Sequence, residues 1–306
     1  MAKIAKTIKI SFRHEEWLKK NKVNFSEWVR KKIDTEIDLQ SKTSGPNQHK
    51  AVILAAGKDK DLFPLTEEIP KTLLDIKGKS ILQRQVELLR NVGIQDVAVI
   101  RGYKKEKINY SSLTYFDNDQ FDSTGSFVSL SLASKFMDSP TIVLYGDILF
   151  DVQSLKNLLE TDDHTTLVVD RGWQKRYQLN KEVPPSPPEL TTLTEKGKTL
   201  EIASIGVDLP ITETTSEFIG LAKLSRNACS ILKDITKNGF STDYKQENIK
   251  ESQIRKASFI DFIEELMKRG ECVTAMEIWR SWIEVDTFED YRNAWKYIDN
   301  ITEDNK

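Results

Sequence analysis

Two features of this chain have the residue types and spacing for phosphate chemistry. Residues 51–57, Ala-Val-Ile-Leu-Ala-Ala-Gly, form an apolar run that predicts a buried strand entering a loop. Because Gly57 has no Cβ, the backbone N–H groups of this loop can approach a phosphate closely. Lys71 follows Pro70 and can bring a positive charge to the same anion. Together these residues predict a nucleotide site.

Three acidic residues far apart in the sequence are candidates for a metal site. Asp147 follows an apolar run and Gly146, where an aspartate alone is more often a solvated loop residue or a helix cap. Glu284 and Asp286 lie two apart in a predicted strand, so their carboxylates face the same side. Mg²⁺ prefers oxygen ligands and is often held by one or two carboxylates plus substrate phosphates. Combined with the phosphate loop, these residues predict a Mg²⁺ site that neutralises charge as pyrophosphate leaves.

The composition is that of a soluble globular protein. Hydrophobic residues make up 39% of the chain and charged residues 30%, and no run approaches the roughly 18 apolar residues of a membrane-spanning helix. The N-terminus lacks the apolar segment of a signal peptide, which predicts a cytoplasmic location. Cys229 and Cys272 are expected to be free thiols, although they could pair. The histidines do not cluster with them, which argues against a zinc site.

The first 42 residues differ in charge from the rest of the chain. They contain eleven Lys/Arg and six Asp/Glu, a balance of +5, whereas the remainder has a balance of −7. Residues 7–12 alternate apolar and polar as in a half-buried strand, and Ser26 predicts the start of a helix. So short a segment cannot bury a core alone, which predicts a homodimer. Residues 43–49 predict a linker to one large domain, 50–306.

Residues 6–39 resemble the ribbon-helix-helix family, through the alternating strand and the stretch 24–30, Asn-Phe-Ser-Glu-Trp-Val-Arg. In that family, strands from two chains pair and enter the major groove of DNA. The resemblance implies that Thr7, Lys9 and Ser11 face the bases. The alternative is a dimerisation or docking segment with no DNA role.

From residue 50 onward, predicted strands and helices alternate. This order is typical of an α/β fold with a mostly parallel sheet and helices on both faces. Since ligands bind at the carboxyl ends of such strands, Gly57, Gly102 and Asp147 are expected at one edge. Strands are predicted at 51–56, 96–100, 141–145, 165–170, 202–207, 217–223 and 283–286, and helices at 81–92, 127–136, 152–159, 258–269 and 290–298.

Residues 50–298 resemble the nucleoside-triphosphate transferases that share a glycosyltransferase-A-like, Rossmann-like fold. The motifs that carry the resemblance are Leu54-Ala-Ala-Gly57, Leu62-x-Pro64-Leu65-Thr66, Pro70-Lys71 and Gly146-Asp147. Within this family the resemblance is greatest to the phosphocholine and phosphonate cytidylyltransferases, including the branch associated with phosphoenolpyruvate mutase. It rests there on the stretches 101–106, 117–118, 124–125, 168–173 and 282–291.

The resemblance implies CTP as the nucleotide and assigns roles to individual residues. Lys71 would stabilise negative charge on the α-phosphate, and Asp147, Glu284 and Asp286 would hold Mg²⁺. The residues implied to bind the nucleotide are Leu54, Ala55, Ala56, Gly57, Lys58, Lys60, Arg101, Thr124, Gly125 and Ser126.

The phosphate loop departs from the wider family at two positions. The family reads Gly-x-Gly-x-Arg after the strand, whereas this chain has Asp59 in place of the second glycine and Asp61 in place of the arginine. Two acids beside a triphosphate should repel it. Either Lys58 and Lys60 take over the phosphate contacts, or Asp61 faces away, or the catalytic loop has decayed.

The acceptor pocket is expected beyond the strand that ends at Asp170. Arg176 suits a phosphonate or phosphate dianion, because its planar fork binds two oxygens at once. The predicted acceptor-binding residues are Asp170, Trp173, Lys175, Arg176 and Glu217. The predicted reaction joins CMP from CTP to 2-aminoethyl- or 2-hydroxyethylphosphonate and needs no general base. The alternatives are phosphocholine or a sugar 1-phosphate as acceptor, and a DNA-binding regulator that senses a nucleotide.

Overall fold

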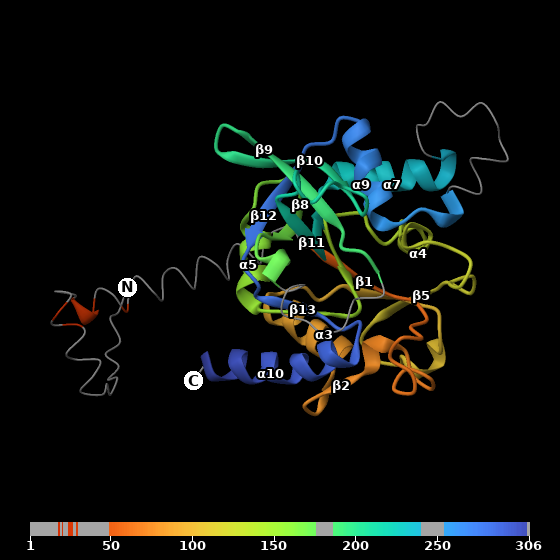
Figure 1. Cartoon of the computed structure of the whole chain (residues 1–306). Helices are drawn as coiled ribbons and strands as arrows, with labels where there is room; N and C mark the ends of the chain where they lie inside the picture. Colours follow the sequence, from red (N-terminus) through yellow and green to blue (C-terminus); the bar gives the residue numbers. More distant parts are fainter. Residues whose placement is uncertain are drawn as a thin grey trace, which may run out of the picture. The chain divides into compact units, whose positions relative to one another are not determined.

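The computed structural model describes residues 49–175, 186–239 and 254–304, together with positions 18, 20, 24–26 and 29. Internal contacts divide the chain into two units, residues 1–48 and residues 49–306 (Figure 1). The predicted N-terminal strand, with Thr7, Lys9 and Ser11, lies outside the described residues. DNA binding and dimerisation through this segment therefore stay predictions.

A large sheet forms the centre of the second unit. Over the described residues it has nine strands: β1 (Lys50–Ala55), β4 (Val97–Arg101), β5 (Thr114–Asp117), β6 (Thr141–Tyr145), β8 (Thr165–Asp170), β9 (Leu190–Lys196), β10 (Thr199–Gly206), β11 (Ser216–Leu224) and β12 (Val273–Ile278). They lie side by side in the order β5-β4-β1-β6-β11-β8-β12-β10-β9 (Figure 1). Two short pairs stand apart from it, β7 (Ile148–Phe150) with β13 (Trp282–Glu284), and β2 (Asp75–Ile76) with β3 (Lys79–Ser80).

Most strands of the large sheet point the same way, as predicted. Strands β5, β4, β1 and β6 are parallel neighbours, and β8 and β12 are parallel to each other. Strand β11 is inserted antiparallel between β6 and β8, and β10 runs antiparallel to β12 and β9. The sequence of β11 did not reveal its direction, because a strand buried on both faces has the same apolar pattern in either direction.

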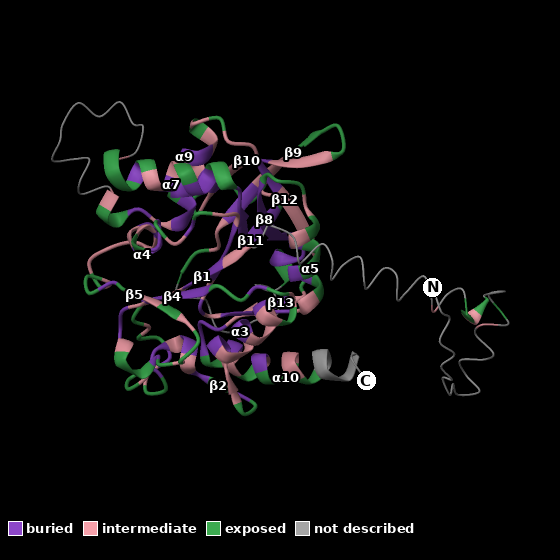
Figure 2. Cartoon of the chain, turned by 180° about the vertical axis from the view of Figure 1, so that it is seen from behind, coloured by how far each residue is buried: buried purple, intermediate pink, exposed green. Residues whose placement is uncertain are grey.

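Helices cover both faces of the sheet. Helices α3 (Ile81–Asn91) and α5 (Val152–Glu160) pack on one face, and α4 (Ser126–Leu132), α7 (Arg226–Asn238) and α9 (Phe259–Lys268) pack on the other. The residues of β1 show the alternation behind this, since Val52 faces the α4 side while Ala51 and Ile53 face the α3 side. Figure 2 shows the buried residues along the strands and the inner sides of these helices.

Local signals explain where several elements begin and end. The Ser80 hydroxyl accepts a hydrogen bond from Gln83 N at 3.1 Å at the start of α3. Gly93 follows this helix with φ +92°, a conformation that glycine adopts at little cost. Helix α7 was not predicted, and α4 ends at Leu132 rather than 136 because residues 133 and 134 bond back over three residues instead of four. None of the described helices combines the length and apolar character needed to cross a bilayer.

Helix α10 (Phe288–Asp304) packs beside β13 and β2 and closes a third, smaller apolar cluster that includes Leu149, Val285 and Ala294. The helix begins two residues before the predicted start, because Asp290 accepts hydrogen bonds from the backbone N–H and hydroxyl of Thr287 (3.1 and 2.8 Å). This capping interaction fixes the turn directly after Asp286.

Candidate active site

Two adjoining cavities open at the carboxyl ends of β1 and β6. The first, of about 260 Å³, is lined by Leu54, Ala55, Gly57, Lys58, Asp59, Asp61, Lys71, Thr72, Gly146, Asp147, Ser186 and Asp286. The second, of about 280 Å³, shares Leu54, Gly57 and Asp147 with it. A Cβ placed on Gly57 would meet nothing within 4 Å, so this loop leaves open space where a phosphate was predicted. The structure therefore brings the predicted phosphate loop and Asp147 to one edge.

Asp147 is held in a tight turn between β6 and β7. The backbone N–H of Gly146 donates to Leu54 O at 2.9 Å, and a Cβ on Gly146 would lie 2.8 Å from that same oxygen. A larger residue here would therefore push the turn away from β1. The Oδ1 atom of Asp147 is buried and has no hydrogen-bond partner among the described residues.

The β7–β13 pair brings the other two acidic residues to Asp147. Val285 N donates to Asp147 O at 3.1 Å, and carboxylate oxygens of Asp147, Glu284 and Asp286 lie within 4.8 Å of one another. Three carboxylates of this spacing, with one buried oxygen lacking a donor, suit a hard divalent cation such as Mg²⁺. These residues thus fit the predicted metal.

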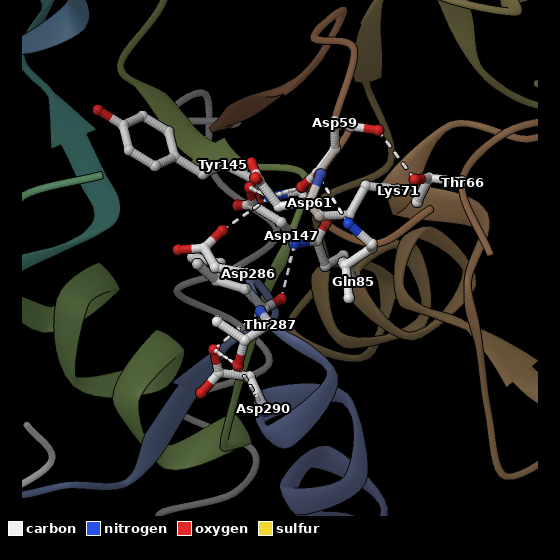
Figure 3. Close-up of polar contacts among 12 residues, drawn as sticks. Asp59, Asp61, Thr66, Lys71, Gln85, Tyr145, Asp147, Asp286, Thr287 and Asp290 are labelled. Atoms are coloured by element: carbon white, nitrogen blue, oxygen red, sulfur yellow. Dashed lines mark hydrogen bonds and ion pairs between the residues drawn. The ribbon is translucent and has the colours of Figure 1, made fainter. Parts of the chain in front are cut away.

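Lys71 lies among the carboxylates of this site. It begins a short 3₁₀ helix, η1 (Lys71–Leu73), and its ammonium is 2.7 Å from Asp59, 3.0 Å from Asp147 and 2.7 Å from Asp286 (Figure 3). Burial acts to lower the pKa of Lys71, but the three carboxylates outweigh it and raise the pKa well above its ordinary value. Lys71 is therefore a permanent cation at neutral pH.

Asp59 faces inward, which resolves how an acid fits in this loop. Its Oδ1 accepts from the backbone N–H groups of Asp61 (2.9 Å) and Leu62 (3.2 Å), while its Oδ2 contacts Lys71. The Thr66 hydroxyl donates to the backbone oxygen of Asp59 at 2.8 Å. Asp59 thus organises the loop and compensates Lys71, whereas Asp61 is exposed at the cavity wall.

Gln85 supports the Asp147 turn, a role that was not predicted from the sequence. Its side-chain amide donates to the carbonyls of Tyr145 and Ile148, both at 2.8 Å, one on each side of Gly146-Asp147. Gln85 is 1% exposed. The available signal was a polar residue four positions from Ile81 and four from Leu89, on the apolar side of the predicted helix.

Residues 51–200 match the family model described as the MobA-like NTP transferase domain. Over this stretch the chain is similar to that family. The CTP:phosphoglutamine cytidylyltransferase of Campylobacter jejuni is 25% identical over 252 residues, which cover 78% of this chain and 96% of that protein. The choline-phosphate cytidylyltransferase of Streptococcus pneumoniae is 33% identical over 117 residues, 37% of this chain and about half (49%) of that protein.

Solved structures share the fold of the unit formed by residues 49–306. The CTP:phosphocholine cytidylyltransferase from Streptococcus pneumoniae superposes with a TM-score of 0.60 at 20% identity, covering 82% of this chain and 99% of that one. The inositol-1-phosphate CTP transferase from T. maritima gives 0.64 at 19% identity, covering 84% and 97%. The predicted glycosyltransferase-A-like α/β fold is therefore confirmed.

The second cavity contains the predicted Thr124-Gly125-Ser126 loop. Gly125 is packed so closely that a Cβ would lie 2.0 Å from Ala257 O, and the Ser126 hydroxyl accepts from Phe259 N at 2.8 Å. The amide of Asn118 donates to Thr124 Oγ1 at 3.0 Å. The loop is thus fixed at the N-terminus of α4, facing the cavity beside Ala56.

Among the predicted nucleotide contacts, the three basic residues lie in different places. Lys58 lines the first cavity, with its ammonium 5.1 Å from the Tyr103 ring centre. Lys60 is exposed and is not among the residues lining either cavity. Arg101 makes two contacts with the Asp117 carboxylate (2.8 and 3.2 Å). It therefore joins β4 to β5 and lines neither cavity.

Among the predicted acceptor residues that the structure describes, none lines either cavity. Asp170, 1% exposed, accepts from the backbone N–H groups of Gly172 (2.7 Å) and Arg280 (3.0 Å) and from the Trp282 indole (3.0 Å), so it ties the end of β8 to the segment before β13. Trp173 and Glu217 are buried, and the Lys175 ammonium lies 5.3 Å from the ring centre of exposed Trp279. Arg176 lies outside the described residues.

A Tyr145–Glu189 pair, which was not predicted from the sequence, lines the second cavity. The Tyr145 hydroxyl lies 3.0 and 2.9 Å from the two carboxylate oxygens of Glu189. Gly220, with φ +77°, leaves room for the tyrosine, since a Cβ there would lie 2.5 Å from its ring. Glu189 gave no signal because it follows a proline-rich stretch that indicates an exposed loop.

The Glu189 carboxyl holds its proton unusually tightly. The pKa of Glu189 is raised to about 7, chiefly by burial; the Tyr145 hydrogen bond acts to lower it, and the charges of Glu217 and Asp147 act to raise it. Near neutral pH the second cavity thus contains a carboxylate that a positively charged ligand group would stabilise.

Proposed function

We propose that the chain is a Mg²⁺-dependent cytidylyltransferase that transfers CMP from CTP to a small phosphonate and releases pyrophosphate. The observation that carries this proposal is the Lys71 ammonium between Asp147 and Asp286, at the cavity wall formed by the Gly57 loop. Both relatives named above are cytidylyltransferases. Their agreement supports CTP as the nucleotide.

The chemistry follows from the charges at the site. An oxygen of the acceptor attacks the α-phosphorus of CTP in line, a new P–O bond forms, and the bond to the pyrophosphate oxygen breaks. The acceptor oxygen is already an anion near neutral pH, so catalysis needs positioning and charge neutralisation rather than a general base. Lys71 would stabilise the negative charge on the α-phosphate. Mg²⁺, held by Asp147, Glu284 and Asp286, would supply further charge neutralisation for the phosphates.

The acceptor is the finer part of the proposal. The relatives and solved structures are named for phosphoglutamine, phosphocholine and inositol 1-phosphate, which share a phosphate oxyanion. The sequence motifs favour a phosphonate. Glu189 favours an acceptor with an amine at its other end, because an ammonium group would compensate its buried charge. We therefore rank 2-aminoethylphosphonate above 2-hydroxyethylphosphonate.

Pyrophosphate release tests the proposal. The purified chain is incubated with Mg²⁺ and CTP, UTP, ATP or GTP, each with 2-aminoethylphosphonate, 2-hydroxyethylphosphonate, phosphocholine, inositol 1-phosphate or glucose 1-phosphate. Release that needs CTP and a phosphonate, and that is lost in Asp147→Asn, is the expected result. Release with phosphocholine or a sugar phosphate, and with neither phosphonate, would identify that compound as the acceptor instead. No release with any combination, while CTP still binds, would favour a nucleotide sensor.

A further inference from the structure

One ammonium group serves three carboxylates at the centre of the candidate site. The contacts from Lys71 to Asp59, Asp147 and Asp286 are all 3.0 Å or shorter, and the four side chains are between 9% and 23% exposed. Ion pairs this short and this poorly hydrated are screened less than surface pairs. Lys71 therefore neutralises part of the site in the absence of any ligand.

Two of the three partners are also members of the metal-binding group. Lys71 contacts Oδ2 of Asp147 and Oδ1 of Asp286, and both carboxylates belong to the cluster that fits a divalent cation. An ammonium and a metal ion attract the same oxygen atoms. Binding of a metal by Asp147 and Asp286 must therefore weaken their contacts with Lys71.

Asp59 differs from the other two partners. It is not part of the carboxylate cluster, and its Oδ1 is fixed by two backbone N–H groups, so its Oδ2 stays aimed at Lys71. It occupies the position where the wider family has the second glycine of the phosphate loop. The acid in this loop thus has a specific contact that a glycine could not make.

We propose that Lys71 is the resting counter-ion of Asp147 and Asp286, and that Asp59 is a positioning residue that retains the ammonium when a divalent cation takes those two carboxylates. The nucleotide phosphate then draws Lys71 from the metal ligands, so nucleotide and metal bind cooperatively. This inference rests on the proposed function for its ligands, a divalent cation and the α-phosphate of a nucleotide.

The test measures Mn²⁺ affinity without turnover, from the electron paramagnetic resonance signal of free Mn²⁺. The decisive variant is Asp59→Asn/Lys71→Met. It removes one negative and one positive charge, so the net charge around Asp147 and Asp286 is unchanged. Asparagine still offers an Oδ1 to the two backbone N–H groups, which keeps the loop together. We expect Mn²⁺ to bind about fivefold to tenfold more tightly than to the wild type, because no cation competes for the two carboxylates.

Two single variants separate contact from long-range charge. Lys71→Met should also tighten Mn²⁺ binding, by about tenfold or more. Lys58→Met removes the same charge from the same cavity, but Lys58 contacts the Tyr103 ring instead of a carboxylate. It should change Mn²⁺ affinity by less than about twofold. A double variant that binds no more tightly than the wild type, or equal effects of Lys58→Met and Lys71→Met, would overturn the proposal.

The nucleotide arm uses CMP, which carries the α-phosphate and binds Mn²⁺ only weakly by itself. Saturating CMP should tighten Mn²⁺ binding to the wild type and have a clearly smaller effect on the double variant. An equal effect on both would remove the cooperative part of the proposal. Because none of these titrations needs an acceptor, silence in the pyrophosphate assay would count against the proposed function alone.

Discussion

The buried charged residues of the two adjoining cavities have different kinds of partner. In the first cavity, the Lys71 ammonium contacts three carboxylates, and the pKa of Lys71 is raised well above its ordinary value. In the second, Glu189 is hydrogen-bonded to a neutral phenol, and its pKa is raised to about 7. The Lys71 ammonium and the Glu189 carboxyl are both buried. Burial favours the neutral form of each, but only Lys71 has partners of opposite charge that offset this effect.

This difference separates two tasks of a transferase. In the first cavity the raised pKa of Lys71 keeps its positive charge at neutral pH, which suits reaction chemistry on a triphosphate. The second cavity contains the loop predicted to contact the nucleoside, Thr124–Ser126, and also Glu189, a carboxylate that gains from a cationic ligand. Glu189 therefore suits selection of an acceptor that carries an ammonium group. The comparison predicts that variants of the first cavity affect the reaction with every acceptor, whereas variants of Glu189 affect some acceptors more than others.

The largest effect is expected from Asp147→Asn. On the proposed function Asp147 would help to hold the metal, and a bound metal contributes several kcal/mol of charge stabilisation. Loss of this carboxylate should therefore lower kcat/KM by about 10³-fold with every acceptor. Asp151→Asn is the matched control, because Asp151 caps α5 through Ser154 N and asparagine caps equally well. Steady-state pyrophosphate release measures both. A similar loss in the two variants would mean that the effect is not specific to the metal site.

Lys71→Met should lower kcat by about 10²- to 10³-fold while Mn²⁺ binding becomes tighter. The opposite directions of the two changes distinguish loss of a catalytic charge from damage to the fold. The raised pKa of Lys71 means that its stabilising contribution is fully present below pH 10.5 and is lost only as pH rises through the higher pKa of the folded state. The rate should therefore show no step from Lys71 between about pH 6 and 9.

Gln85→Leu should destabilise the domain by about 1–3 kcal/mol, because two buried carbonyls lose their donor. Activity should fall by about tenfold as the Asp147 turn loses its support. Urea unfolding and Mn²⁺ titration give the two readouts. Gln83→Leu, in the same helix, removes only a side-chain contact with Glu87 and should change neither by much.

Glu189→Gln should raise KM for 2-aminoethylphosphonate about fivefold and change KM for 2-hydroxyethylphosphonate by less than about twofold. The reason is that only the amine gains from the carboxylate charge. Equal increases in KM for both acceptors would contradict a role of Glu189 in acceptor selection. They would not count against nucleotidyl transfer itself.

The smallest expected effect is on stability. The folded-state pKa of Glu189, about 7, lies above the model-compound value of 4.5, so folding favours the protonated form. Its contribution to stability is greatest below pH 4.5 and is lost as pH rises toward 7, where the buried carboxyl ionises. The Tm difference between Glu189→Gln and the wild type should therefore grow across this range. A Tm difference that does not change with pH would mean that the Glu189 carboxyl is hydrated and not buried.

The sequence predicted most of the fold because its signals were local. β6 and β8 match their predicted ranges, and Gly57, Gly102 and Asp147 follow the ends of parallel strands as expected. The structure also brings Asp147, Glu284 and Asp286 together. The antiparallel insertion of β11 escaped prediction, since direction depends on neighbours that a single strand does not encode.

What the sequence could not show were pairings between distant segments. From the sequence, Arg101 was predicted to bind the nucleotide. In the structure, Asp117 of β5 lies beside its guanidinium and pairs with it. Asp59 seemed to repel the triphosphate because its contact with Lys71 depends on how the loop folds back. Glu189 became a candidate only through Tyr145 on a different strand. Each of these outcomes depends on tertiary contacts that residue type alone does not determine.

The β7–β13 pair brings together acidic residues that are far apart in the sequence, since Glu284 lies in register with Ile148, next to Asp147. A chain still being synthesised has Asp147 long before it has Glu284 and Asp286. The three carboxylates therefore come together only when β7 and β13 pair across all the elements from α5 to β12, which has a cost in loop-closure entropy. Metal that binds the finished set stabilises the native chain over partly folded forms by mass action. Metal binding at these carboxylates would thus shift the folding equilibrium toward chains in which β7 and β13 have paired.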